Sequence, residues 1–167
     1  KLTTDAISGA TTAQLAAITS TVFATLSTDQ IASLSATQLS SLAVPKIQAL
    51  TTKQIQALDA EDVAVLSVDQ VGGMSTQQVA ALTTAQVSVL TAGQVEAFTT
   101  AQISELTETQ IAAMSTAQIK SIETTDVQKL TAAQLQAITT AGVKAMTADQ
   151  ITALTTAQIS ELTDTQA

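Results

Sequence analysis

The chain has 167 residues and contains no Arg, His, Cys, Trp, Tyr or Asn. Without His and Cys it lacks an imidazole base, a thiolate nucleophile and the usual zinc ligands, so we expect no enzyme activity, no catalytic residue, no cofactor, no metal site and no small-molecule substrate. The formal net charge of −8 argues against a nucleic-acid partner, because phosphate contacts need clustered Lys and Arg, and no apolar run approaches the roughly 18 residues of a membrane span.

An eight-residue repeat organises the chain from its first residues onward. Apolar side chains recur every eight positions from Leu2 to Leu162, which gives 20 full units, the first at 2–9 and the last at 154–161, and a six-residue remnant. In every unit a second apolar residue follows five positions after the first, as Ile7 follows Leu2. The consensus is L-[ST]-x-x-Q-[IV]-x-x, so each unit offers two apolar positions to a common core.

A period of eight predicts that the helix breaks in every unit. At about 100° per residue, an apolar stripe on an uninterrupted helix would rotate by roughly 80° from one unit to the next. Coiled coils use repeats of seven or eleven because those lengths lie close to whole numbers of turns. We therefore expect short helices separated by breaks.

The repeat also supplies the residues that begin each short helix. Ser or Thr follows the first apolar position and Gln comes three residues later, as Thr83 precedes Gln86; this is the S/T-x-x-E/Q capping box. With Thr83 as N-cap, Leu82 and Val87 occupy the two positions of a hydrophobic staple. The pattern predicts an all-α fold, a superhelical solenoid of short capped helical turns with one turn per eight-residue repeat.

Departures from the consensus are expected to keep this plan. Asp59, followed by Asp62, retains an N-cap oxygen, and Pro45 falls in the first helical turn, where proline is tolerated. The segments 43–46 and 71–74 depart most from the pattern. The residue before the next first apolar position is small in many units, which favours close backbone approach: Ala17, Ala49, Ala57, Gly73, Ala81, Ala97, Ala113, Ala137, Ala145 and Ala153.

The register separates an inside from an outside. We expect Leu82, Val87, Leu90, Val95, Phe98 and Ile103 to be buried and Thr84, Thr100 and Glu105 to be exposed, with Thr, Gln and Ala coating the surface. A β-solenoid is the alternative fold, since Thr, Ile and Val favour strands, although the five glycines follow no period and no Asn marks a corner. Two large apolar residues in most units argue against disorder.

Carboxylates and hydroxyls are the remaining candidates for chemistry. The acids that lie close in sequence are Glu61, Asp62 and Asp69, then Glu105 with Glu108, and Glu161 with Asp164. Paired acids serve glycosidases and calcium sites, but most of these acids fall near the start of a helical turn, where the helix dipole favours negative charge. The second residues of the threonine pairs are not needed for capping and can present a regular hydroxyl array: Thr84, Thr100, Thr140 and Thr156.

Four phrases carry a resemblance to known arrays: LTTAQVSVL (82–90), FTTAQISEL (98–106), MTADQITAL (146–154) and LTTAQISEL (154–162). They resemble the long LTTAQI-type octapeptide arrays of very large bacterial surface or secreted proteins, some described as hemolysin-like or adhesin-like. The resemblance extends over nearly the whole chain. It implies an extracellular or cell-surface location and brings no active-site residues.

Together these observations favour a structural function. We expect residues 1–167 to form one repeat array, a segment of a longer chain or fibre, because it starts at Lys1 and stops inside a repeat at Ala167. The leading interpretation is a fibre- or stalk-forming segment that spaces other domains or associates end to end with further copies as a homopolymer. The alternative is a ligand-, surface- or ice-binding solenoid that presents its threonine array.

Overall fold

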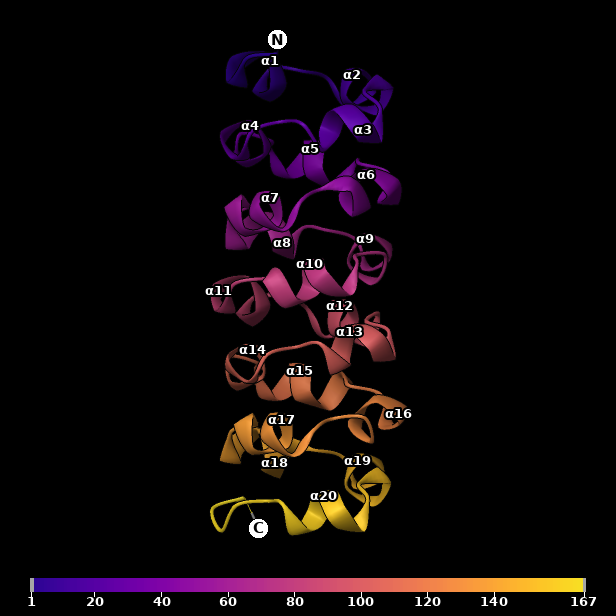
Figure 1. Ribbon diagram of the computed structural model, residues 1–167, viewed down its shortest axis with the longest axis vertical. Coiled ribbons are helices and arrows are strands. Elements are labelled where there is room, and N and C mark those ends of the chain that lie inside the picture. The colour runs from indigo at the N-terminus through magenta and orange to yellow at the C-terminus, as the bar shows by residue number, and fades with distance from the viewer. Residues whose placement is uncertain (1, 167) are drawn as a thin grey trace.

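The computed structural model describes residues 2–166 and is helical along this range (Figure 1). No strand occurs within these residues, so the all-α solenoid is confirmed over the β-solenoid. None of the described helices is long and apolar enough to cross a membrane. Lys1 and Ala167, at which the array is expected to continue, lie outside the described residues.

Each eight-residue unit, or octad, contributes one helix of four to six residues. The helices are α1 (Thr4–Ser8), α2 (Thr12–Ala17), α3 (Ser20–Phe23), α4 (Thr28–Ala32), α5 (Ala36–Ser40), α6 (Val44–Ala49), α7 (Thr52–Ala57), α8 (Ala60–Ala64), α9 (Val68–Gly72), α10 (Thr76–Ala81), α11 (Thr84–Ser88), α12 (Ala92–Glu96), α13 (Thr100–Ser104), α14 (Glu108–Ala112), α15 (Thr116–Ser121), α16 (Thr124–Val127), α17 (Ala132–Ala137), α18 (Thr140–Ala145), α19 (Ala148–Ala153) and α20 (Thr156–Ser160).

The breaks between helices are formed by residues with extended backbone. Between α6 and α7, Leu50 has φ −63° and ψ 136°, and the N-cap Thr51 has φ −71° and ψ 160°. Two successive extended residues turn the chain into a new direction before the next helix begins. The octad therefore becomes a corner followed by a helix, and never a segment of one long helix.

The predicted capping box forms in 14 of the 20 helices. In α11 the amide of Thr83 donates to Oε1 of Gln86 over 2.8 Å, and the amide of Gln86 donates to Oγ1 of Thr83 over 3.2 Å. Both bonds satisfy amides that a helix start leaves unpaired.

The helices that depart from the consensus still form, but one capping prediction is wrong. α8 begins directly after Asp59, yet the Asp59 side chain makes no capping hydrogen bond. To cap, its carboxylate would have to approach the Asp62 amide beside the Asp62 carboxylate, and two negative charges at that distance repel. Pro45 lies at the start of α6, as predicted. The segments 43–46 and 71–74, which depart most from the consensus, contain the start of α6 and the end of α9, and both helices form.

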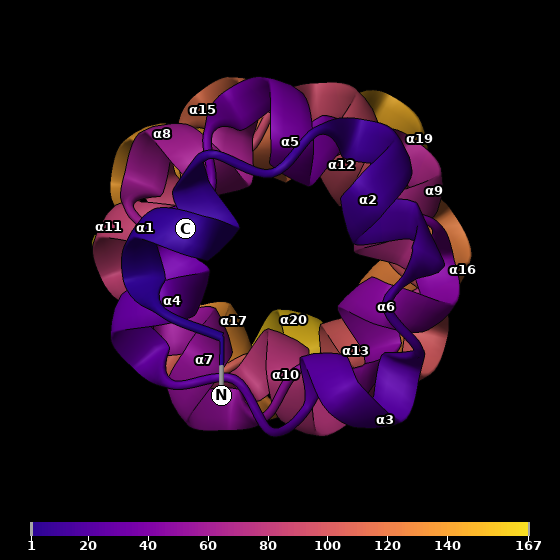
Figure 2. The same ribbon diagram turned by 90° about the horizontal axis from the view of Figure 1, so that it is seen from above.

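Consecutive helices wind into a right-handed superhelix. Seen from the N-terminal end, the chain runs clockwise from α1 through α2 and α3 to α4 as it recedes from the viewer (Figure 2). Each helix packs against the third helix after it, as α12 packs against α15, while hydrogen bonds join helices four places apart, as in α11 and α7. A superhelical turn therefore holds between three and four octads, and helices seven places apart, such as α2, α9 and α16, lie in similar directions in Figure 2.

The two apolar positions of successive octads build one continuous core along the axis. The six residues predicted to be buried are at most 4% exposed, and Thr84, Thr100 and Glu105 are exposed, as predicted. Helices this short do not persist alone in water, because helix nucleation is costly. Burying a Leu or Ile contributes about 1.5–3 kcal/mol, so stacking of turns is what stabilises them.

Candidate functional site

The glutamine at the third helical position is the side chain that joins successive turns. The sequence predicted that Gln would coat the surface, and for this position that is wrong, because the side chains are buried. We call these residues the glutamine ladder: Gln30, Gln38, Gln54, Gln70, Gln78, Gln86, Gln94, Gln102, Gln110, Gln118, Gln134, Gln150, Gln158 and Gln166.

Each ladder glutamine acts in its own turn and in the turn before it. Besides accepting from the Thr83 amide, Gln86 donates from Nε2 to the carbonyl oxygens of Ile55 (2.8 Å) and Leu58 (2.7 Å), which lie 31 and 28 residues earlier. Gln118 repeats the pattern with Val87 and Leu90, both at 2.7 Å. One amide group thus caps the start of one helix and the end of another.

The chemistry of these bonds explains why the residue is Gln. The last carbonyls of a helix have no partner within it, and a buried carbonyl without a donor costs about 1–3 kcal/mol. Glu would satisfy the capping box but has no hydrogen to donate when ionised. The sequence carried this signal, because none of its six Glu residues occupies the third helical position.

Two charged residues replace ladder glutamines inside the stack. Lys46 is 9% exposed, and its Nζ donates to the carbonyl oxygen of Ala16 over 2.8 Å, so it keeps a donor facing the preceding turn. Asp126 is 3% exposed and cannot donate when ionised; its Oδ1 instead accepts from Oγ1 of Thr100. The position therefore selects for hydrogen bonding across the turn, and each replacement meets that need differently.

Asp62 is the third charged replacement, and it is only partly buried. Burial raises the pKa of its carboxyl above the ordinary value of 3.8, and the carboxylates of Asp59 and Glu61 raise it further, while a backbone hydrogen bond at Asp59 lowers it. As a carboxylate it offers the preceding turn no donor. Asp62 therefore lacks the hydrogen bond that a ladder glutamine makes to the preceding turn, as does Gly142 at the same position of α18.

The carboxylate groups singled out in the sequence do not converge on one site. Glu61, Asp62, Asp69 and Glu108 lie in the first turns of α8, α9 and α14, where the helix dipole favours them. Glu105 and Glu161 instead occupy the C-caps of α13 and α20. Among residues 2–166 no three acids, His or Cys come together in a way that could hold a metal ion.

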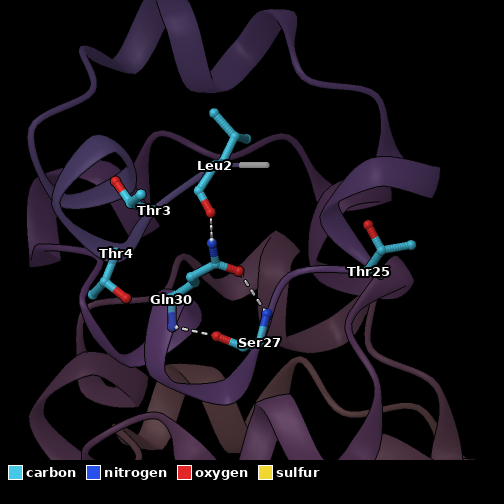
Figure 3. Close-up of a pocket in the computed structure, with 6 residues that line it drawn as sticks. All are labelled: Leu2, Thr3, Thr4, Thr25, Ser27 and Gln30. Atoms are coloured by element: carbon cyan, nitrogen blue, oxygen red, sulfur yellow. Dashed lines mark hydrogen bonds between the residues drawn. The ribbon is translucent and has the colours of Figure 1, made fainter.

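The first turn carries an open hollow of about 400 Å³, lined by Leu2, Thr3, Thr4, Thr25, Ser27 and Gln30. Figure 3 shows that Nε2 of Gln30 donates a hydrogen bond to the Leu2 carbonyl, while its Oε1 accepts one from the Ser27 amide. The lining is hydroxyl, amide and aliphatic, with no charged side chain among these six residues. It offers hydrogen bonds but, among these six residues, no base that would activate a nucleophile.

The second threonines form an irregular surface rather than a uniform one. Thr84, Thr100 and Thr156 are exposed, whereas Thr140 is half-buried. The Thr100 hydroxyl is in addition committed to Asp126 in the next turn.

Comparison with known sequences matches the repeat. A family model described as the ALTTAQ repeat matches residues 47–76, 71–100 and 119–156, which together make up more than half of the chain. All three matches begin at the second apolar position of an octad: Ile47, Val71 and Ile119. No curated protein matches the sequence.

Proposed function

The chain belongs to the ALTTAQ repeat family, and from this premise we propose that it is a structural segment of an extracellular or cell-surface bacterial protein. It is a stiff superhelical spacer that holds other domains apart and extends end to end by further turns of the same kind.

The sameness of the interface between turns carries this proposal. Near the start, Gln38 donates to the carbonyls of Ile7 and Ala10, and near the end Gln158 donates to those of Val127 and Leu130, at the same two separations of 31 and 28 residues. A solenoid whose neighbouring turns meet through the same hydrogen bonds along most of its length resists bending. This uniformity suits a spacer.

The two sides of each turn are complementary, which supports extension from end to end. Towards the preceding turn an octad presents an amide donor, and towards the following turn it presents carbonyl acceptors. Such a heterologous contact builds an open helical assembly unless it closes into a ring. In the last turn Ile151 and Ile159 occupy the core position but are 38% and 44% exposed, because no later turn lies over them in this structure.

The placement of the threonines favours a spacer over an ice-binding surface. Thr84 begins α11, whereas Thr100 and Thr156 begin α13 and α20, which lie together on another side of the axis in Figure 2. The three hydroxyls therefore do not share one flat face.

Doubling the array tests the spacer. Two copies joined through one added residue between Ala167 and Lys1 keep the octad register, because 167 residues are one short of 21 octads. We expect electron microscopy and small-angle scattering to show a rod of twice the length and unchanged diameter. A compact particle, or two rods joined at a variable angle, would overturn the spacer.

Sedimentation over a concentration series tests association separately. We expect the single array to associate, and Ile159→Lys in the last turn to weaken association, whereas Ala101→Lys, on an exposed residue along the side, does not. A monomer at every concentration would overturn self-association while leaving the doubled rod as a test of the spacer.

A further inference from the structure

The glutamine ladder by itself does not determine which turn stacks on which. Every octad offers the same two backbone carbonyls, and most offer the same amide. A shift by one whole octad would leave these hydrogen bonds equally satisfied. A solenoid with a single register therefore needs side chains that differ from octad to octad.

One close contact shows where such side chains meet. A Cβ placed on Gly73 would overlap Cγ1 of Val44 in the preceding turn. Val44 is the first residue of α6, and Gly73 is the C-cap of α9, directly before the next first apolar position. The two are 29 residues apart, and a small residue on one side leaves room for the valine on the other.

Repeat symmetry relates the same two positions in other octads, and we call them the 29-residue pairs. Where the first residue of a helix is large, the residue 29 positions later is small: Val44 pairs with Gly73, Val68 with Ala97, and Glu108 with Ala137. Alanines at the first helical position pair with larger ones: Ala36 with Val65, Ala60 with Val89, Ala92 with Ser121, and Ala132 with Glu161. No pair joins two valines, and none joins two residues as small as Ala or Gly.

A one-octad shift destroys this complementarity in the sequence. At a separation of 21 residues, Val44 would face Val65 and Val68 would face Val89, while the four alanines would face Ala57, Ala81, Ala113 and Ala153. At 37 residues, Val68 would face Glu105, and Ala36 would face Gly73. Overpacking and cavities both destabilise a packed interface. The observed separation avoids both.

A polar contact independently favours the same register. The buried Asp126 accepts from the Thr100 hydroxyl, and Thr100 is the first residue of α13. A shift by one octad would replace Thr100 with Ala92 or Glu108. The buried carboxylate would then lose this donor or face a like charge.

We propose that the 29-residue pairs form a register code, in which complementary side-chain size selects the turn that stacks on each turn and so sets the number of octads in the superhelical turn. The ladder supplies the hydrogen bonds between turns, and the code chooses among the equivalent ways of making them.

A double-mutant cycle at one pair tests the code. Gly73→Ala should lower the unfolding midpoint by about 4 °C or more, because the new Cβ would overlap Val44 Cγ1 and lie 2.9 Å from the Asp69 carbonyl oxygen, and adding Val44→Ala should recover the part of that loss that Val44 causes. Gly93→Ala is the matched control, since its Cβ would meet Val68 Cγ1 at an ordinary 3.8 Å. The proposal is overturned if Gly73→Ala is as harmless as Gly93→Ala, or if Val44→Ala gives no relief.

Disulfide trapping measures the register itself, because the chain has no cysteine. A Cβ at residue 73 would overlap Cγ1 of Val44, and Cγ1 is one bond away from the Cβ of Val44. Cysteines at a 29-residue pair therefore bring their Cβ atoms within the roughly 4 Å that a disulfide needs. We expect Thr84→Cys with Ala113→Cys to cross-link, and Thr84→Cys with Glu105→Cys, 21 residues apart, not to.

Removing the differences in side-chain size at the 29-residue pairs should then make the register ambiguous. With Val44, Val65, Val68, Gly73 and Val89 all changed to Ala, and Asp126 changed to Gln to remove its contact with Thr100, we expect both cysteine pairs to trap. Trapping of the 29-residue pair alone would show that the register is set elsewhere and would overturn the proposal. Should this variant not fold, the double-mutant cycle decides.

Discussion

The middle of the solenoid and its first turn use the same octad with different results. In the middle, Gln86 is 1% exposed and bonds to both its own cap and the preceding turn. In the first turn, Gln14 is exposed and still accepts from the Thr11 amide over 2.8 Å, but no earlier turn offers it a carbonyl in this structure. The capping box is therefore local to an octad, whereas the bond between turns belongs to the stack.

Two further octads of the first turn extend this comparison. Ala6 and Val22 stand at the ladder position, and α1 and α3 still form, each capped by the hydroxyl of Thr3 or Thr19. A helix in this fold thus forms without the glutamine, and α6, α8 and α16 form even without a side-chain capping hydrogen bond. The glutamine stabilises the stacking of one turn on another.

The largest expected difference between the two regions is in the core. Leu90→Ala should lower the free energy of unfolding by about 2–5 kcal/mol, because Leu90 is 4% exposed and its removal leaves a cavity. Leu2→Ala, at the same octad position but 43% exposed, should cost less than about 1 kcal/mol. Denaturant unfolding measures both.

Hydrogen exchange locates the effect of Leu90→Ala. Faster exchange should appear in α11 and α12 and in the helices stacked on them, because each repeat touches only its neighbours. Equal costs for the two variants, or unchanged exchange around Leu90, would contradict the division into a packed interior and an open first turn.

The next largest difference concerns the ladder. Gln86→Glu keeps the acceptor for the Thr83 amide but leaves the carbonyls of Ile55 and Leu58 without their donor, so we expect a loss of about 2–4 kcal/mol at neutral pH. Gln14→Glu has no such bonds to lose and should change stability by less than about 0.5 kcal/mol. Thermal unfolding of the two variants side by side measures the contrast. Similar losses would mean that capping, and not bonding between turns, accounts for the glutamine.

The sequence predicted what is local and periodic. The spacing of Leu82 and Val87 placed both in the core, and the spacing of Thr83 and Gln86 placed the helix start, because a capping box and a staple depend only on residues within one octad. The two core positions recur in all twenty octads and the capping box in most of them, which made these short-range signals unambiguous.

Contacts that depend on the path of the superhelix could not be predicted from the sequence. The partner of Lys46 is the carbonyl of Ala16, 30 residues away, and no local pattern identifies it. The number of octads in a turn follows from backbone angles at breaks such as Leu50, where small differences accumulate around the ring. Gln was assigned to the surface by its polarity, although a buried amide is stable when all its hydrogen bonds are made.

The smallest expected effect arises at Asp62. Its octad lies in the interior but resembles those of the first turn, because it offers no side-chain amide to the preceding turn. Because burial raises the pKa of its carboxyl in the folded state, the folded chain holds this proton more tightly than the unfolded chain. The free energy of unfolding should therefore fall as pH rises from 3.8 through the raised folded pKa, and the loss is complete at neutral pH.

Asp62→Asn removes this titration, and Asp62→Gln should add about 1 kcal/mol by supplying a donor to the preceding turn. Denaturant unfolding as a function of pH, with the exposed Asp69→Asn as control, should rank Asp62→Gln above Asp62→Asn and the unaltered chain at neutral pH, with the differences shrinking in acid. If Asp62→Gln is no more stable than the unaltered chain at neutral pH, the lack of a donor at Asp62 does not weaken the stack.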